Sequence, residues 1–126
     1  MATAGELTNA QVARFRAAAQ RRHQAEQQAL ARREQRAWDL ARRAAVLLRD
    51  EFHADWVAVF GSLIHPGCFT PWSDVDIAAR GIAPRDTLRA MESVRDLSED
   101  IPVNLVDLAV CSDSLRRVVE REGQPA

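Results

Sequence analysis

The fold is decided by residues 56–77, which read WVAVFGSLIHPGCFTPWSDVDI. The first five of these residues form a short apolar run that predicts a buried strand, and Gly61 directly after them lets the backbone turn sharply. The middle of the stretch holds two prolines and a glycine, so we expect one helical turn at most, followed by a loop. Residues 74–79 alternate carboxylate and apolar side chains, which predicts a second strand with one face turned to a cleft.

Helices and a third strand are expected on either side of this stretch. Residues 8–52 contain neither proline nor glycine and are rich in alanine, arginine, glutamine and leucine, which predicts a long helix opened by a capping box between Thr8 and Gln11. Further along, the pattern predicts an amphipathic helix over 84–97, a strand over 103–110 and a closing helix over 112–122 with Gly123 as its C′ residue. We therefore expect an α/β or α+β fold, with a small mixed sheet of about three strands, flanking helices and a long helix before them.

Two of these helices have an apolar face that should pack inward. In the helix over 84–97 that face consists of Leu88, Met91, Val94 and Leu97; in the last turns of the long helix it consists of Trp38, Ala41, Ala45 and Leu48, with Val46 and Leu47 beside them.

The near-neutral net charge of −1 conceals a basic first part and an acidic second part. Ten arginines and four acids precede Asp50, whereas seven arginines and fourteen acids lie from Asp50 onward. At 126 residues there is room for one core, so we expect residues 1–37 to form a projecting basic helical arm and 38–126 a single domain. The thin apolar stripe of the arm suits a partner helix or a self-association seam, and a solvated, fraying extension is the alternative.

Several classes of protein and site are disfavoured by the composition. No apolar run is long enough to span a bilayer, and residues 1–11 lack the features of a secretory signal. Cys68 and Cys111 lie far apart without further ligand residues, so we expect free thiols in a reducing cytoplasm. Nucleic-acid binding through the arginines of the arm is disfavoured, because few aromatic residues accompany them and the acidic part of the chain repels phosphate.

Asp74 and Asp76 are the first candidates for chemistry. Two residues apart in a strand, they present both carboxylates on one face, with Cα atoms about 7 Å apart. Paired carboxylates repel each other unless a cation lies between them, and oxygen ligands of this kind suit Mg²⁺ or Mn²⁺. Such a pair is also common at ordinary strand ends. Here, however, Gly61-Ser62 follows the preceding strand, and its amides and hydroxyl suit an anion. The strand, the Gly-Ser turn and the acid pair together indicate a functional site more specifically than the pair alone.

This combination resembles the GS…SDxD signature of the minimal nucleotidyltransferase (MNT) family, which belongs to the DNA polymerase β-like superfamily. The resemblance extends from about Trp38 to Gly123. It implies a nucleotidyltransferase fold in which Asp74 and Asp76 bind Mg²⁺ or Mn²⁺, Gly61 and Ser62 hold the β- and γ-phosphates, and Ser73 belongs to the nucleotide site. It also implies transfer of NMP, with ATP as the expected substrate, to a hydroxyl acceptor.

Two departures from the family pattern bear on this expectation. Many relatives carry arginine after the serine, where this chain has Leu63, so a phosphate contact is either missing or made by His65 or Arg80. The family also draws a third carboxylate from the next strand, where this chain has Asn104, which offers a carbonyl oxygen but no charge and no base. Asp107 lies at the opposite strand parity and replaces that acid only if a bulge re-aims it; otherwise it is a polar residue that closes the strand.

Three functional readings follow. Small members of the family often act as the antitoxin of a HEPN–MNT toxin–antitoxin pair and transfer AMP to a helical partner, which implies a HEPN-like toxin bound through the N-terminal helix. A second reading is a catalytically weakened or inactive module that neutralises a partner protein by contact. The third is the disfavoured nucleic-acid-binding protein.

Overall fold

The computed structural model describes residues 7–126. The prediction that residues 1–11 lack a secretory signal therefore falls partly outside the described residues. The chain divides into two compact units, Met1–Arg32 and Arg33–Ala126, and helix α1 (Asn9–Phe52) contributes to both. The predicted boundary between residues 37 and 38 stays a prediction about how the chain is organised. No helix within residues 7–126 combines the length and apolarity that a membrane span needs.

The first unit, as far as it is described, is the beginning of α1. The predicted capping box is present: the Thr8 amide donates to Gln11 Oε1 at 2.8 Å, and the Gln11 amide donates to Thr8 Oγ1 at 3.1 Å. Every residue of 7–32 is exposed or half-buried, including Phe15, whose exposed fraction is 61%. This part of the helix therefore has no fully buried side chain that would stabilise it.

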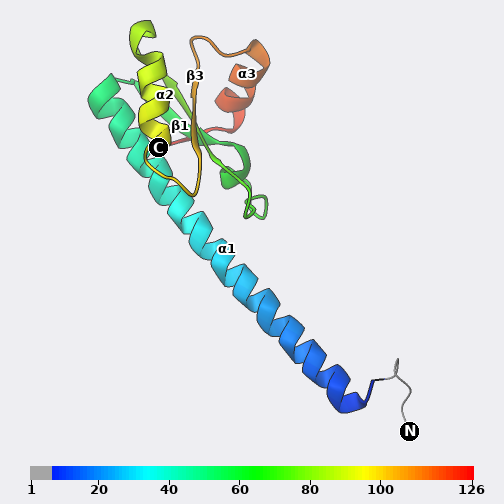
Figure 1. Ribbon diagram of the computed structural model, residues 1–126. Coiled ribbons are helices and arrows are strands. Elements are labelled where there is room, and N and C mark those ends of the chain that lie inside the picture. The colour runs from blue at the N-terminus through cyan, green and yellow to red at the C-terminus, as the bar shows by residue number, and fades with distance from the viewer. Residues whose placement is uncertain (1–6) are drawn as a thin grey trace. The chain divides into compact units, whose positions relative to one another are not determined.

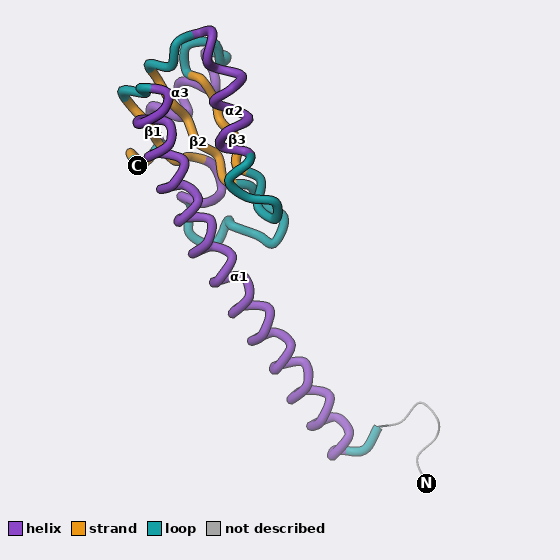
Figure 2. The backbone as a smooth tube through the Cα atoms, turned by 60° about the vertical axis from the view of Figure 1, so that its left-hand side comes forward, coloured by secondary structure: helices purple, strands orange, loops and turns teal. Residues whose placement is uncertain are grey.

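The second unit is built on a mixed four-stranded sheet in the order β3-β2-β1-β4 (Figures 1 and 2). The strands are β1 (Trp56–Phe60), β2 (Val75–Arg80), β3 (Val103–Asp107) and β4 (Gln124–Pro125). β1 pairs antiparallel with β2 and β4, whereas β2 and β3 are parallel, so the chain between them must cross over. The predicted mixed sheet is confirmed, and the fourth strand was missed because two residues are too short to show a pattern.

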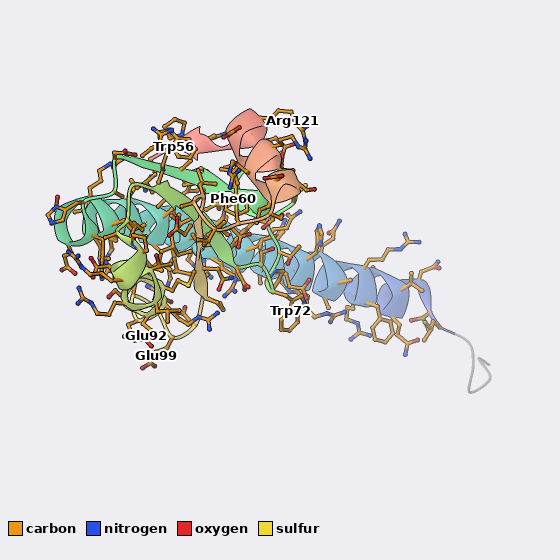
Figure 3. The ribbon with its side chains drawn as sticks, turned by 90° about the horizontal axis from the view of Figure 1, so that it is seen from above. Trp56, Phe60, Trp72, Glu92, Glu99 and Arg121 are labelled. Atoms are coloured by element: carbon orange, nitrogen blue, oxygen red, sulfur yellow. The ribbon has the colours of Figure 1, made fainter. Side chains whose placement is uncertain are left out.

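Helices cover the sheet on both faces. In Figures 1 and 3, α3 (Asp113–Glu122) lies on one side of the strands, and α2 (Thr87–Arg95) and residues 33–52 of α1 lie on the other. Beneath α3, its Val119 packs with Phe60, Ala78 and Leu108 in a buried cluster. On the opposite face, alternate strand residues such as Val57 and Ile77 are fully buried.

The inward face of α1 confirms the predicted Ala41, Ala45 and Leu48 but differs from the prediction at its edges. The buried residues are Ala37, Leu40, Ala41, Ala44, Ala45, Leu48 and Phe52, which follow the helical repeat. The face therefore turns away from Trp38, which is half-buried, and from Val46, whose exposed fraction is 57%. The close packing of four alanines explains the shift, since small side chains let the helix approach the sheet.

The predicted inward face of the helix after β2 is confirmed at Val94, which is fully buried, and is wrong at Leu88. It begins as a 3-10 turn over Pro84–Asp86 and becomes α-helical at Thr87. The exposed fraction of Leu88 is 75%, whereas Ala90 is buried and Met91 and Leu97 are half-buried. The reason is polar: the Thr87 hydroxyl donates to the buried carboxylate of Asp107 at 2.8 Å, which fixes the rotation of the helix.

The close of α3 brings a further correction. Gly123 has φ −59°, so it is not the left-handed C′ residue that we predicted. A Cβ there would lie 2.5 Å from the Val119 carbonyl oxygen and 3.3 Å from Ala58 Cβ. Glycine is thus needed because the chain passes close to α3 and β1 as it enters β4.

The burial along α1 leads to a stability prediction. Replacing the fully buried Leu48 by alanine is expected to lower the free energy of unfolding by about 2–5 kcal/mol, whereas Val46→Ala should change it by less than about 0.5 kcal/mol. Urea unfolding followed by circular dichroism measures both variants. Equal losses in the two variants would contradict the orientation of α1 described above.

Candidate active site

The strand pairing brings the predicted site residues together at one end of the sheet. Asp76 is the register partner of Phe60 in β1 and of Asn104 in β3, and all three lie on the face that α3 partly covers. Asp74 precedes β2 directly, and Gly61 follows β1 directly. Two carboxylates, one amide and a glycine turn therefore meet although they come from three separate strands.

The glycine turn and Asp76 are in close contact. Gly61 begins a 3-10 turn (Gly61–Ile64) and has φ +78°, a conformation that favours glycine. A Cβ on Gly61 would lie only 2.4 Å from Asp76 Oδ2. The missing side chain of Gly61 is what makes room for the carboxylate, and Ser62 lies next to it, half-buried.

The Asn104 side chain lies between the Asp74 carboxylate and the guanidinium of Arg95. Its Nδ2 donates to Asp74 Oδ2 at 3.1 Å, and its Oδ1 accepts from Arg95 Nη2 at 2.9 Å. Arg95 is the last residue of α2, and nothing in the sequence pattern links it to Asn104. It is a site residue that sequence reasoning missed.

Burial of the Asp76 carboxyl raises its pKa above the ordinary value, and the negative charge of Asp74 raises it further. Hydrogen bonding by the Asn104 side chain acts in the opposite direction and lowers it. The amide of Asn104 thus serves both acids, with its direct bond made to Asp74.

The raised pKa predicts that ionised Asp76 weakens the metal-free fold. Because the folded-state pKa lies above the unfolded one, the contribution of Asp76 to stability is present at low pH and is lost as pH rises through the folded pKa. Asp76→Asn is therefore expected to raise the free energy of unfolding at pH 7, and the gain should shrink as pH falls toward the carboxyl range. Thermal unfolding across pH measures the gain, with the exposed Glu99→Gln as control. If the stability gain of Asp76→Asn stays constant with pH, ionisation of the Asp76 carboxyl is not its cause.

The remaining predicted residues are placed elsewhere. Asp107 does not join the site, because the β2–β3 register runs without a bulge and its carboxylate is buried on the opposite face, bonded to Thr87 and to the Ala109 amide. Arg80 lies at the far end of β2 and pairs with Asp55 at 3.1 Å, so it does not reach the site. The His65 Nε2 lies 3.4 Å from Glu122 Oε2.

Ser73 has a structural part in the loop that leads to Asp74. Its hydroxyl accepts from the Thr70 amide at 2.9 Å, and its carbonyl oxygen accepts from Arg33 Nη2 at 3.2 Å. Phe69, which is 3% exposed, anchors the same loop in the core. Against this fixed loop the Trp72 side chain stands 88% exposed and points away from the sheet (Figure 3).

The donor set limits the kind of metal site that the residues can form. Asp74 and Asp76 offer carboxylate oxygens, which suit Mg²⁺ or Mn²⁺. Within residues 7–126 no group of three or more histidine, cysteine or acidic side chains is placed to hold a metal ion. A divalent cation at this pair would therefore need further oxygen ligands in addition to the two carboxylates.

Comparison with known proteins supports the fold independently. No protein-family model matches the sequence, and no curated protein matches it. Among solved structures, a chain in a crystal structure of the toxin–antitoxin MntA–HepT matches with TM-score 0.51 and 23% identity over 68% of each chain. A chain in a mutant of that pair matches with TM-score 0.55 and 22% identity, covering 68% of this chain and 70% of that one. At such identities the likeness concerns the fold, and it confirms that this chain has the nucleotidyltransferase fold expected from its GS…SDxD motif.

Proposed function

We propose that this protein is a metal-dependent nucleotidyltransferase that moves a nucleoside monophosphate, with AMP expected, from a triphosphate to a hydroxyl group on a partner protein. The observation that carries the proposal is the meeting of Asp74 and Asp76 with the Gly61 turn at one end of a nucleotidyltransferase-fold sheet. Any surface can carry two acids, but here a glycine with φ +78° leaves space for one of them.

The proposed reaction is an in-line substitution at the α-phosphorus. The acceptor hydroxyl oxygen forms the new P–O bond, the bond from the α-phosphorus to the bridging oxygen breaks, and pyrophosphate leaves. A divalent cation held by Asp74 and Asp76 would stabilise the attacking and leaving oxygens. The hydroxyl proton passes to solvent or to an aspartate, since the Asn104 amide has no basic group.

The other residues of the site would position the triphosphate. The half-buried Gly61–Ser62 turn offers backbone N–H groups and one hydroxyl beside the carboxylates, which suits β- and γ-phosphate oxygens. The Asn104 Nδ2 donates to Asp74 Oδ2 and so restrains the position of that carboxylate. The chain has no lysine, so any cationic contact to phosphate must come from arginine.

A protein acceptor fits this chain better than a small molecule. The structures with the matching fold are of a toxin–antitoxin pair, which supports a toxin as the partner here. The exposed indole of Trp72, two residues from Asp74, suits a partner surface, because tryptophan is enriched at the centre of interfaces. The basic, uncovered helix over residues 9–32 is a second surface that suits a partner.

Calorimetry with Mg²⁺ and ATP tests the nucleotide site. Wild type is expected to bind, and the double variant Asp74→Asn/Asp76→Asn is expected to bind at least about tenfold more weakly, because it loses both charges that hold the cation. Asp86→Asn/Asp113→Asn, which removes two acids outside the site, is the control. No binding by folded wild type would contradict the proposal.

A second candidate function is neutralisation of the partner by contact alone. The observation in its favour is Asn104, which stands where a third acid would serve and is tied to Arg95. Mass spectrometry of the partner, mixed with this protein with and without ATP, separates the two functions. A mass increase of one AMP that requires ATP identifies transfer, whereas neutralisation without any mass change identifies contact.

A further inference from the structure

The orientation of the Asn104 amide is determined by its two neighbours. An arginine side chain can only donate hydrogen bonds, and an ionised carboxylate can only accept them. With Arg95 Nη2 at 2.9 Å on one side and Asp74 Oδ2 at 3.1 Å on the other, Asn104 must turn Oδ1 to the arginine and Nδ2 to the aspartate. The opposite orientation would bring two donors together on one side and two acceptors together on the other.

This orientation corrects one expectation from the sequence. The carbonyl oxygen of Asn104 was expected to be available to a metal, but it is bonded to Arg95 and faces away from Asp74. What Asn104 presents to the carboxylates is a donor, which competes with a cation for Asp74 Oδ2. The guanidinium beyond it adds a positive charge on the same side.

We propose that Arg95 is a positioning residue that, by holding Asn104 with its N–H toward Asp74, weakens the binding of divalent cations at the aspartate pair. The metal part of this inference rests on the proposed function, whereas the orientation part stands without it. Arg95 is well suited to the role because the buried Ala90 and Val94 hold its helix against the sheet while its own side chain stays exposed. Arg95 and Asn104 also line a cavity of about 220 Å³, together with Met91, Glu92, Val103 and Leu105.

Removing Arg95 should therefore have two measurable effects. Without Arg95, the Asn104 side chain is free to rotate and offer Oδ1 as a ligand, and a nearby positive charge is lost. Both changes favour binding of a divalent cation at Asp74 and Asp76. Arg95→Ala is expected to bind Mn²⁺ about fivefold more tightly than wild type, as measured by electron paramagnetic resonance without nucleotide. Arg95→Gln, which keeps a donor for Asn104 but no charge, should give a smaller increase.

Nuclear magnetic resonance reports the orientation directly. The chain has two asparagines, so the side-chain amide signals of Asn104 can be assigned by comparison with Asn104→Ala. In Arg95→Ala these amide protons should exchange with water faster, whereas in the control Arg85→Ala, an exposed arginine just before α2, neither exchange nor Mn²⁺ affinity should change. Unchanged exchange in Arg95→Ala, or equal tightening in Arg85→Ala, overturns the inference. Absence of Mn²⁺ binding in wild type and in Asn104→Asp, both with and without ATP, would instead contradict the proposed function, and the exchange measurement would still decide the role of Arg95.

Discussion

Gly61→Ala is expected to weaken binding of the Mg²⁺–ATP complex by at least about 100-fold. The added Cβ would lie 2.4 Å from Asp76 Oδ2, closer than a side-chain carbon can approach an oxygen, so the carboxylate or the turn must move. A misplacement of about 1 Å at an active site can lower a reaction rate about 100-fold, and we expect a loss of similar size in the binding of this complex. Calorimetry measures the loss.

A matched control separates the contact from backbone strain. Gly67 has the same φ of +78°, but a Cβ there would meet nothing within 4 Å. Both alanine variants should lose about 1–2 kcal/mol of stability through the left-handed conformation, but Gly67→Ala should keep nucleotide binding. If both variants bind equally well, the close approach of Gly61 and Asp76 has no functional meaning.

Asn104→Asp is expected to increase the rate of transfer to the partner protein by about 100-fold. The new carboxylate would add a charge to the cation site and a group able to take the acceptor proton, and proton transfer of this kind commonly contributes at least this much. Arg95, at 2.9 Å from the side chain of Asn104 in this chain, is placed to compensate the additional charge. Single-turnover transfer from radiolabelled ATP measures the rate.

The control for this prediction is Asn104→Ala, which removes the amide without adding an acid. It should not accelerate transfer, because it supplies neither charge nor base. An aspartate variant that folds but is no faster than wild type would mean that the amide donor itself is needed, and that this chain is not a weakened form of a three-acid site.

The parts of the site that could be predicted are those encoded by neighbouring residues. A strand, a glycine and a pair of acids at alternate positions can be read locally, because strand geometry alone places Asp74 and Asp76 close together. The sequence alone also showed that Asn104 replaces a third acid, because that position can be identified from its neighbours in the strand. The parity argument also predicted correctly that Asp107 faces away unless a bulge intervenes, and the register shows none.

The features that could not be predicted depend on contacts between distant segments. Arg95 reaches Asn104 from the end of a helix, and the partner that Asp107 finds in Thr87 rotates that helix and leaves Leu88 in water. The hydrophobic repeat correctly placed Val94 inside, but it gave no sign that Leu88 would be exposed. Strand β4 pairs with β1 through two residues, a length at which local preference carries no information.

The exposed indole of Trp72 gives the protein an intrinsic optical reporter. With an exposed fraction of 88%, this residue should emit at longer wavelength than Trp38 and Trp56, which are both half-buried. Because it stands two positions before Asp74 on a loop anchored by Phe69, we expect a partner protein that covers this loop to change its emission wavelength and its accessibility to a quencher. Binding of a partner over this loop can thus be followed in dilute solution without a label attached to either protein.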